Sequence, residues 1–442
     1  MNERTSALSN DEGPMPTSFD SASQNHSAQS PAVIIVGPPW PRGGAARVIQ
    51  NQIEFYRYRG FFTVFIAVPF YWSFISLGRN LKELMEGMNE LGSDRLFTAI
   101  LDQKGYNAAK YAASIRHAFR GTILDWQVAV GKAAQLLDED IDFLSKLRPA
   151  LFHVNHVYTL GFALNLRRRL LGRGSRLPVI LETHDVQAHL VHERSRANPW
   201  TRRPDALKRL IKSEAEHLKR VDALIHLSVD DFKFFQTVMP SKPQFLALPT
   251  IDEKFASVVS VAAPRSETID LLFVGQGHPP NLAAIKWFLE TVWPLISDRH
   301  YNLKIVGLIG QMVQRELPQL YDTFRSFFVG EVVELAPFYR TTRCVIAPMV
   351  SGSGTSIKTI EALALGKPFV GTSKAFRGMP MERLKEAGIQ AHDDPQSFAD
   401  AIFRALSAER EAGVASRAAY DNVFSTRASF AARDEALRVV TS

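Results

Sequence analysis

The 442-residue sequence is poor in cysteine and has no long apolar run. Cys344 is the only cysteine, which excludes an internal disulfide and is typical of a reducing compartment. The longest uncharged run, Phe61–Leu77, contains Pro69 and falls short of the ~20 residues of a membrane-spanning helix. We therefore expect a buried strand at Thr63–Val68, followed by an aromatic loop, Phe70–Trp72, that could touch a bilayer interface.

The sequence also lacks the patterns of several common functional classes. No zinc-ligand spacing, helix-turn-helix pattern or aromatic-basic RNA motif accompanies the net charge of +7, so no nucleic-acid partner is expected. No serine-nucleophile elbow or P-loop is present. His189 and His192 lack a clear third ligand, and the acidic triplet Asp138–Asp140 stands in a helical context, so we expect no metal site.

Positive charge gathers in one part of the chain. Leu151–Arg220 contains 14 Lys and Arg against 6 Asp and Glu, and includes Arg167–Arg169 and Arg202–Arg203. Three interpretations remain open: a solvated helix face, an anionic membrane surface, or a phosphorylated substrate. The expected location is the cytoplasm, with peripheral attachment to a membrane as an open alternative.

The order of elements divides the chain into four segments. Residues 1–30 are rich in Ser, Asn, Asp and Pro, show no signal-peptide pattern, and are expected to form a disordered tail. Strands alternate with helices over 31–248 and again within 249–408, where the pattern restarts near Ile269. A helical segment, 409–442, follows, with a final helical stretch over roughly Arg417–Val440. Such alternation predicts two α/β domains, each a parallel sheet covered by helices.

One glycine-rich stretch stands where a buried strand meets an apolar helix. It reads GSGTSIKTIEALALGKP and follows the strand RCVIAPM, so we expect a helix at Thr355–Leu365. Gly352 and Gly354 let backbone N–H groups approach a ligand closely. A helix start adds unpaired N–H groups and the positive end of the helix dipole, which together suit a phosphate.

Two charged residues follow these glycines. Lys358 lies in the first turn, where a cation opposes the helix dipole unless an anion also binds there. Glu361 is three residues further on and therefore adjacent on the helix surface. A lysine for phosphate beside a carboxylate for paired hydroxyls suits the diphosphate and ribose of a nucleotide. A glycine-rich turn carrying a surface Lys–Glu pair is the alternative.

The wider stretch PMVSGSGTSIKTIEALALGKPFV resembles the donor-binding signature of retaining glycosyltransferases of family 4, which have the two-domain GT-B fold. Segments resembling that family occur in the expected order from Ala32 to about Arg404, including VGPPWPRGGAARVIQ and LLFVGQGHPPNLAAI. The resemblance implies two Rossmann-like domains with parallel sheets that face each other across a cleft. It also implies a first domain on the acceptor side and a second that binds the nucleotide sugar.

The resemblance also implies roles for particular residues. His184 would lie close to the transferred sugar. The residues themselves, rather than the resemblance, suggest that Lys358 stabilises the departing diphosphate, and these two are the expected catalytic residues. Glu361 would hold the ribose hydroxyls, and Val329–Val332 lies where the base would be. The implied donor-binding residues are Gly43, Gly44, Gly275, Gly330, Gly352, Ser353, Gly354, Thr355, Ser356, Lys358 and Glu361. No cofactor or metal is implied, because the nucleotide sugar acts as co-substrate.

Two departures from the family pattern are visible. The position eight residues before Glu361 is commonly glutamate in the family but is Ser353 here. The loop Gly275–Asn281 lacks the Arg and Lys that often neutralise the diphosphate, and Lys358 is the candidate replacement.

The expected function is therefore transfer of a sugar from a nucleotide sugar to a glycan or lipid-linked glycan, in polysaccharide or glycoconjugate biosynthesis and with retention. A sugar-nucleotide epimerase and a non-catalytic sugar-nucleotide-binding subunit remain as alternatives.

Residues that follow strands of the first domain are candidates for contact with the acceptor. His156 and Tyr158 follow the strand in ALFHVNHVYTLGF, and Asp185 follows the strand in PVILETHD. Packing within a loop is the alternative for the first two, and capping of a helix is the alternative for the third. His153 lies on its strand, where a buried, hydrogen-bonded histidine is expected.

Overall fold

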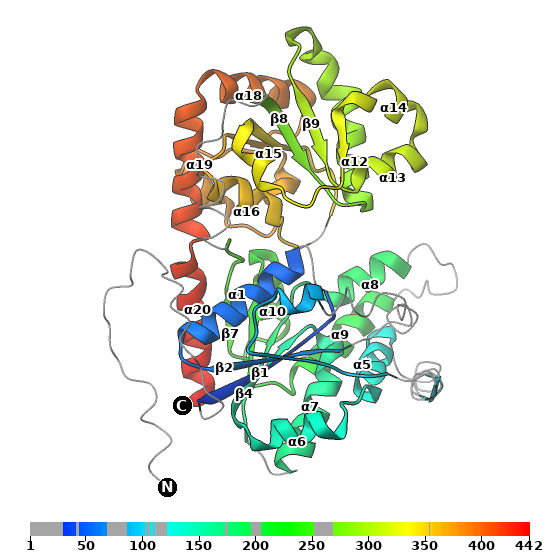
Figure 1. The fold of residues 1–442 in the computed structure, drawn as a ribbon, viewed down its shortest axis with the longest axis vertical. Helices are drawn as coiled ribbons and strands as arrows, with labels where there is room; N and C mark the ends of the chain where they lie inside the picture. Colours follow the sequence, from blue (N-terminus) through cyan, green and yellow to red (C-terminus); the bar gives the residue numbers. More distant parts are fainter. Residues whose placement is uncertain are drawn as a thin grey trace.

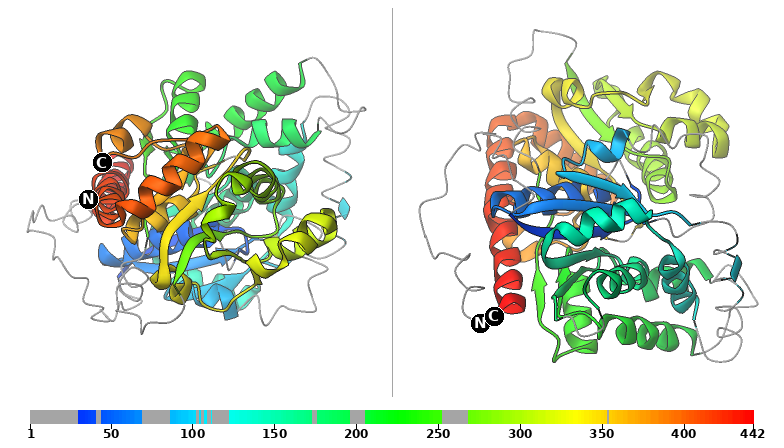
Figure 2. Two further views of the ribbon diagram at one scale, coloured as in Figure 1. Left: turned by 90° about the horizontal axis from the view of Figure 1, so that it is seen from above. Right: turned by 60° about the horizontal axis from the view of Figure 1, so that its bottom comes forward.

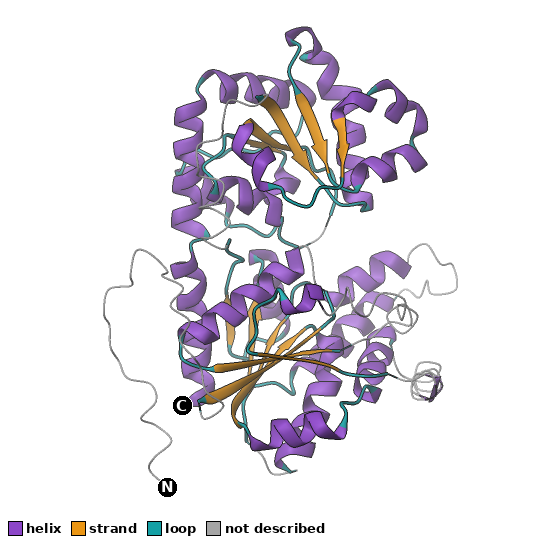
Figure 3. Cartoon of the chain, in the orientation of Figure 1, coloured by secondary structure: helices purple, strands orange, loops and turns teal. Residues whose placement is uncertain are grey.

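The computed structural model describes residues 30–40, 44–68, 86–101, 104, 107–108, 111, 122–172, 176–195, 205–251, 268–352 and 354–442. Two α/β domains lie one above the other in Figure 1, and in each a sheet lies between helices (Figure 3). The expected aromatic loop Phe70–Trp72, the pair Arg202–Arg203 and all but the last residue of the expected tail lie outside the described residues. The prediction of two parallel-sheet domains is confirmed.

The first domain is built on seven parallel strands in the order β3-β2-β1-β4-β5-β6-β7. The strands are β1 (Pro31–Gly37), β2 (Phe62–Ala67), β3 (Arg95–Thr98), β4 (Arg148–Asn155), β5 (Val179–Glu182), β6 (Ala223–His226) and β7 (Gln244–Leu246). The helices are α1 (Gly44–Tyr58), α5 (Ile123–Ala133), α6 (Asp138–Lys146), α7 (Leu160–Leu171), α8 (Gln187–Ser195), α9 (Ala206–Leu218) and α10 (Val229–Val238). The strand expected at Thr63–Val68 is β2, displaced by one residue.

The apolar run of β1 shows why a strand in this sheet has no polar face. Ile34 and Val36 pack into one hydrophobic cluster, whereas Val33 and Ile35 pack into a second cluster on the opposite face. Successive side chains of a strand point to opposite faces, so a sheet covered by helices on both sides needs apolar residues at every position.

The second domain is built on five parallel strands in the order β10-β9-β8-β11-β12. The strands are β8 (Ile269–Val274), β9 (Leu303–Val306), β10 (Phe328–Gly330), β11 (Thr342–Ala347) and β12 (Phe369–Gly371). The helices are α12 (Pro279–Trp287), α13 (Ile309–Glu316), α14 (Pro318–Thr323), α15 (Ala336–Thr341), α16 (Ile357–Ala364), α17 (Met381–Glu386) and α18 (Pro395–Ser407). Asp394 caps α18 by accepting from the Ser397 amide at 2.9 Å, as the Asp-Pro pair predicts.

The chain ends in two helices, α19 (Glu409–Val423) and α20 (Thr426–Thr441), which run along one side of both domains (Figures 1 and 2). The stretch Arg417–Val440 is helical, as expected, but it is divided between two helices. Phe424 has non-helical torsion angles, and the Ser425 hydroxyl accepts from the Ala428 amide at 3.4 Å, which begins a new helix. The break returns the chain to the first domain, where α20 packs against β5, β6 and β7.

Candidate functional site

The carboxyl ends of the strands in the two sheets meet between the domains. A methyl group built on Gly44, at the start of α1, would lie 2.8 Å from Cγ1 of Ile357, at the start of α16. Thr355 donates from Oγ1 to the carbonyl oxygen of Leu227 at 2.8 Å. Ligands of open α/β sheets bind beyond the carboxyl ends of the strands, so this meeting place is the candidate site.

The donor loop, residues 348–356, connects β11 to α16 and carries the glycines expected at a phosphate site. Gly352 and Gly354 have φ angles of 124° and 64°, which side chains with a Cβ rarely adopt. The helix begins at Ile357, two residues later than expected. Among the described residues, no protein group accepts from the backbone N–H groups of 355–358. No described residue therefore competes with a ligand for these donors.

Lys358 is held against the second sheet. Its Nζ donates to Oδ1 of Asn281 at 2.6 Å and lies 4.7 Å from the centre of the Phe273 ring. Burial and the positive charge of Arg377 lower the pKa of Lys358 to about 7, against the opposing effect of Glu361. Asn281 lies in the first turn of α12, directly after the β8 loop (residues 275–278), so the ammonium lies beside the loop that contains no Arg or Lys.

Glu361 lies one turn further along α16 and is half-buried. Tyr339 donates from its hydroxyl to Oε2 of Glu361 at 3.2 Å. Burial raises the pKa of the Glu361 carboxyl, and the charge of Arg47, from α1 of the first domain, opposes that shift. The alternative of a surface Lys–Glu pair does not fit, because both groups are half-buried and each is held by a partner from another element.

Arg377, which follows β12, is a residue that the sequence analysis missed. A methyl group built on Gly352 would lie 3.3 Å from Cζ of Arg377, so the guanidinium rests directly on the donor loop. Its Nη1 donates to the carbonyl oxygen of Lys374 at 2.8 Å. Arg47 was also missed. It lies in the first turn of α1, just after the Gly-Gly pair, and this position could have indicated from the sequence that it faces the site. No motif surrounds Arg377.

His184 is held by a hydrogen-bond network in the first domain. Asn155 donates from Nδ2 to the Val36 carbonyl at 3.4 Å and to Gln52 Oε1 at 3.0 Å, so its oxygen must be the group that faces His184. His184 Nε2 lies 2.8 Å from that oxygen and therefore carries the ring proton, which leaves a lone pair on Nδ1. Burial lowers the pKa of His184 to about 4, so the ring is neutral at pH 7.

His156 stacks on His184 with ring centres 4.1 Å apart. Both residues have positive φ angles, 67° and 58°, which are uncommon for residues with a Cβ and mark backbone strain at a site. Within the described part of the chain, neither ring nitrogen of the buried His156 has a hydrogen-bond partner. Tyr158 stacks on the other side of His156 at 4.7 Å and packs into the hydrophobic core.

A buried ionic network lies beneath these histidines. Glu182, the last residue of β5, accepts from Nη2 of Arg433 of α20 at 3.3 Å and lies 3.4 Å from Nε2 of His153. His153 Nδ1 lies 2.8 Å from the hydroxyl of Tyr56, which confirms the expected buried, hydrogen-bonded histidine. Burial raises the pKa of Glu182, but Arg433 and His153 outweigh it and lower the pKa to about 2.

The remaining predicted residues lie at several places. Asp185 meets the donor loop, because a methyl group built on Gly354 would lie 2.7 Å from its Oδ1. Ser356 is buried, and its Oγ accepts from the Thr359 hydroxyl at 3.0 Å. Gly275 follows β8, and Gly330 ends β10 with a φ angle of 91°. Gly43 and Ser353 lie outside the described residues.

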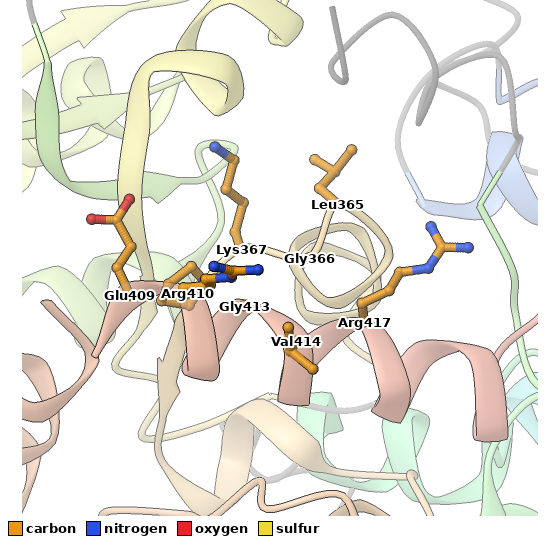
Figure 4. Close-up of a pocket in the computed structure, with 9 residues that line it drawn as sticks. Leu365, Gly366, Lys367, Glu409, Arg410, Gly413, Val414 and Arg417 are labelled. Atoms are coloured by element: carbon orange, nitrogen blue, oxygen red, sulfur yellow. The ribbon is translucent and has the colours of Figure 1, made fainter. Parts of the chain in front are cut away.

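A separate hollow of about 510 Å³ lies at the far end of α16, away from the donor loop (Figure 4). It is lined by residues 365–368 and by residues of α19 that include Arg410 and Arg417. Over the part of the chain that the structure describes, no three His, Cys, Asp or Glu residues are grouped so as to hold a metal ion. The same part contains no helix long and apolar enough to cross a bilayer.

The chain is similar to known proteins in two respects, the sequence of its second domain and its fold. Residues 268–408 match the family model of group 1 glycosyl transferases. No curated protein matches the chain in sequence. Similar solved structures include a trehalose 6-phosphate synthase from Burkholderia multivorans (15% identity, TM-score 0.60, covering 93% of this chain and 99% of that one). A glycosyltransferase from Rickettsia africae gives 12% identity, a TM-score of 0.58 and coverages of 93% and 98%. HepE of Anabaena, in complex with UDP and glucose, gives 14% identity, a TM-score of 0.56 and coverages of 92% and 99%.

These likenesses extend over almost the whole chain at low identity, so they establish the fold, which is GT-B. The fold and the matched second domain together define a glycosyltransferase. Its second domain is of the group 1 type, which confirms at this level the resemblance carried by the stretch from Pro348 to Val370.

Proposed function

We propose that this glycosyltransferase moves a sugar from a nucleotide sugar to a glycan or a lipid-linked glycan, in polysaccharide or glycoconjugate biosynthesis. One observation supports the donor site above all. The first N–H groups of α16 have no acceptor among the described residues, and the same turn carries Lys358, whose ammonium donates to Asn281. Preorganised donors and a cation are what a departing nucleoside diphosphate needs.

Each group has a distinct task in this proposal. The start of α16 and Lys358 stabilise the negative charge that develops on the departing diphosphate. Glu361 binds the ribose hydroxyls. Neutral His184 accepts a hydrogen bond from a sugar hydroxyl through Nδ1, since its Nε2–H is committed to Asn155. Contact between the domains excludes water and favours transfer over hydrolysis.

His156, Tyr158 and Asp185 are the proposed acceptor-side residues. Support comes from the two unpartnered ring nitrogens of buried His156 and from the strained backbone at this position. Retention at the anomeric carbon and independence of a metal ion rest on the family resemblance alone. The anomeric proton coupling of the product measures the first, and turnover in the presence of a chelator measures the second.

The nucleotide proposed for the first assays is UDP. Two of the similar structures, HepE of Anabaena and a trehalose-6-phosphate protein of E. coli, are complexes with UDP or a UDP sugar. Both are less than 25% identical to this chain. They therefore guide only the choice of the first ligand, and the binding experiment determines which nucleobase is preferred.

A panel of nucleotide sugars, monitored for release of the diphosphate with and without membrane extract, tests the proposal. We expect acceptor-dependent release for one donor. Glu361→Ala should mainly weaken nucleotide binding, and Lys358→Ala should mainly lower turnover. Conversion of a donor without any acceptor would instead indicate an epimerase. Nucleotide binding without turnover on any acceptor would indicate a binding subunit.

We also propose that the protein works in the cytoplasm, with the basic first domain directed toward an anionic membrane. Arg168 and Arg169 lie in the last turn of α7. Flotation with anionic liposomes tests the attachment, and protein that remains at the bottom of the gradient at low salt would overturn it.

A further inference from the structure

The β8 loop of this chain lacks the cations expected beside a diphosphate, and the structure brings cations there from elsewhere. Lys358 reaches Asn281, at the start of the helix that follows this loop. Arg377 comes from the loop after β12, which is more than 70 residues from the β8 loop in the sequence. The two charges are close enough for Arg377 to lower the pKa of Lys358.

Arg377 has a fixed position on the donor loop. Its guanidinium lies against Gly352, and its Nη1 is anchored by the carbonyl oxygen of Lys374 at 2.8 Å. Because Gly352 has no side chain, nothing separates the planar guanidinium from the backbone that leads to the start of α16. An anchored guanidinium with further N–H groups is well suited to bind phosphate oxygens in pairs.

Two half-buried cations beside a helix start repel one another unless an anion neutralises them. Glu361 partly offsets the charge of Lys358, and the anion that acts on Arg377 is Asp185 of the first domain. Its Oδ1 would lie 2.7 Å from a methyl group built on Gly354, which places the carboxylate in the mouth of the donor loop. Burial lowers the pKa of the Arg377 guanidinium, and the charge of Asp185 raises it.

We propose that Arg377 is a diphosphate-binding residue that supplies the charge missing from the β8 loop, and that Asp185 acts as its counter-ion while the donor site is empty. The incoming diphosphate then replaces the Asp185 carboxylate beside Arg377. This inference rests on the proposed function, and it adds two residues with opposite effects on the same ligand.

Because Arg377 and Asp185 are expected to change the affinity for a diphosphate in opposite directions, binding measurements alone can test the proposal. Calorimetric titration of the full chain with UDP, GDP and ADP, and with the corresponding nucleosides, gives the ratio of nucleoside to diphosphate dissociation constants. That ratio isolates the contribution of the phosphates, and a general loss of folding would not change it selectively. We expect Arg377→Gln to lower the ratio about 10- to 100-fold, as loss of a charge-assisted hydrogen bond does. Arg377→Lys should recover part of it.

Asp185→Asn should raise the ratio severalfold, because the diphosphate no longer displaces a carboxylate. Arg410→Gln is the matched control, since it removes one arginine from the same domain at the hollow beyond the far end of α16. It should leave the ratio unchanged.

The outcomes separate this inference from the proposed function. A wild-type chain that binds none of the nucleoside diphosphates overturns both. Normal binding by the wild type, with an unchanged ratio in Arg377→Gln, overturns the role of Arg377 and leaves the donor site in place. An unchanged or lower ratio in Asp185→Asn overturns the exchange of counter-ions.

Discussion

At the scale of a single residue, burial brings the pKa of Lys358 close to neutral pH. Its Nζ is enclosed by Asn281, the Phe273 ring and the sulfur of Met349, which lies 3.9 Å away. Burial and Arg377 lower its pKa to about 7. The ammonium is therefore about half protonated near pH 7 and loses its charge as the pH rises further. A bound diphosphate favours the charged form and raises the pKa again.

We predict that nucleoside diphosphate binding weakens by up to about tenfold as the pH rises from 7 to 8.5 and that binding takes up a proton near pH 7.5. Titration calorimetry in buffers of different ionisation enthalpy measures both quantities. Lys358→Arg is the control, since arginine stays charged over this range and should give a flat profile. An equally flat profile in the wild type would contradict the prediction.

At the scale of the elements, the site depends on the ends of two helices that belong to different domains. The first residue of α1 lies against the first residue of α16, and the glycine at position 44 leaves just enough room for Ile357. Close approach of backbone to side chain, rather than a special torsion angle, therefore accounts for this glycine. Thr355, which lies in the donor loop just before α16, donates to the Leu227 carbonyl of the first domain. This hydrogen bond joins the two domains at the same interface.

We predict that Gly44→Ala lowers turnover by about 10- to 100-fold, because the added methyl group displaces α1 from α16 and misaligns groups supplied by both domains. The double variant Gly44→Ala/Ile357→Ala should recover most of the activity, since it returns the missing space. Steady-state kinetics on both variants and on Ile357→Ala alone provide the test. Failure of the double variant to recover would show that Gly44 contacts the donor itself.

At the scale of the whole molecule, the last helix ties the second domain to the floor of the site in the first. Arg433 of α20 is 1% exposed and pairs with Glu182, which is completely buried and lies two residues before His184. Thr250, where the chain leaves the first domain, lies 2.9 Å from the hydroxyl of Tyr420 of α19. The two crossings between the domains are therefore joined to each other.

We predict that Arg433→Met destabilises the protein by about 3–5 kcal/mol, because it leaves the Glu182 carboxylate buried and unpaired. Arg433→Met/Glu182→Gln should cost much less, since neither charge remains. The pKa of Glu182 is lowered from 4.5 to about 2, so the pair stabilises the fold above pH 4.5, and this stability is lost as the pH falls toward 2. Urea unfolding between pH 3 and 7 measures both effects. Equal destabilisation in the single and double variants would contradict the prediction.

Local sequence patterns were sufficient to predict those elements whose structure depends on residues close together in the chain. The apolar run of β1, the glycines of the donor loop and the Asp-Pro cap of α18 each predicted a structure that was found. The break at Phe424 was missed because α19 and α20 are both amphipathic and only a single serine cap separates them. The β8 loop contains no Arg or Lys, and for that reason we expected Lys358 to replace the missing cation. The structure places the Lys358 ammonium beside that loop.

The sequence by itself determined the two parallel sheets, the glycine-rich turn and the helix start that follows it, because each depends on neighbours within one or two turns of chain. Only the tertiary structure decided that Arg377, Arg47 and Asp185 converge on that helix start and that Arg433 supports His184 from below. These residues come from loops and helices that lie far apart in the sequence, from Arg47 to Arg433, and their charges interact only after both sheets and the final helix have packed.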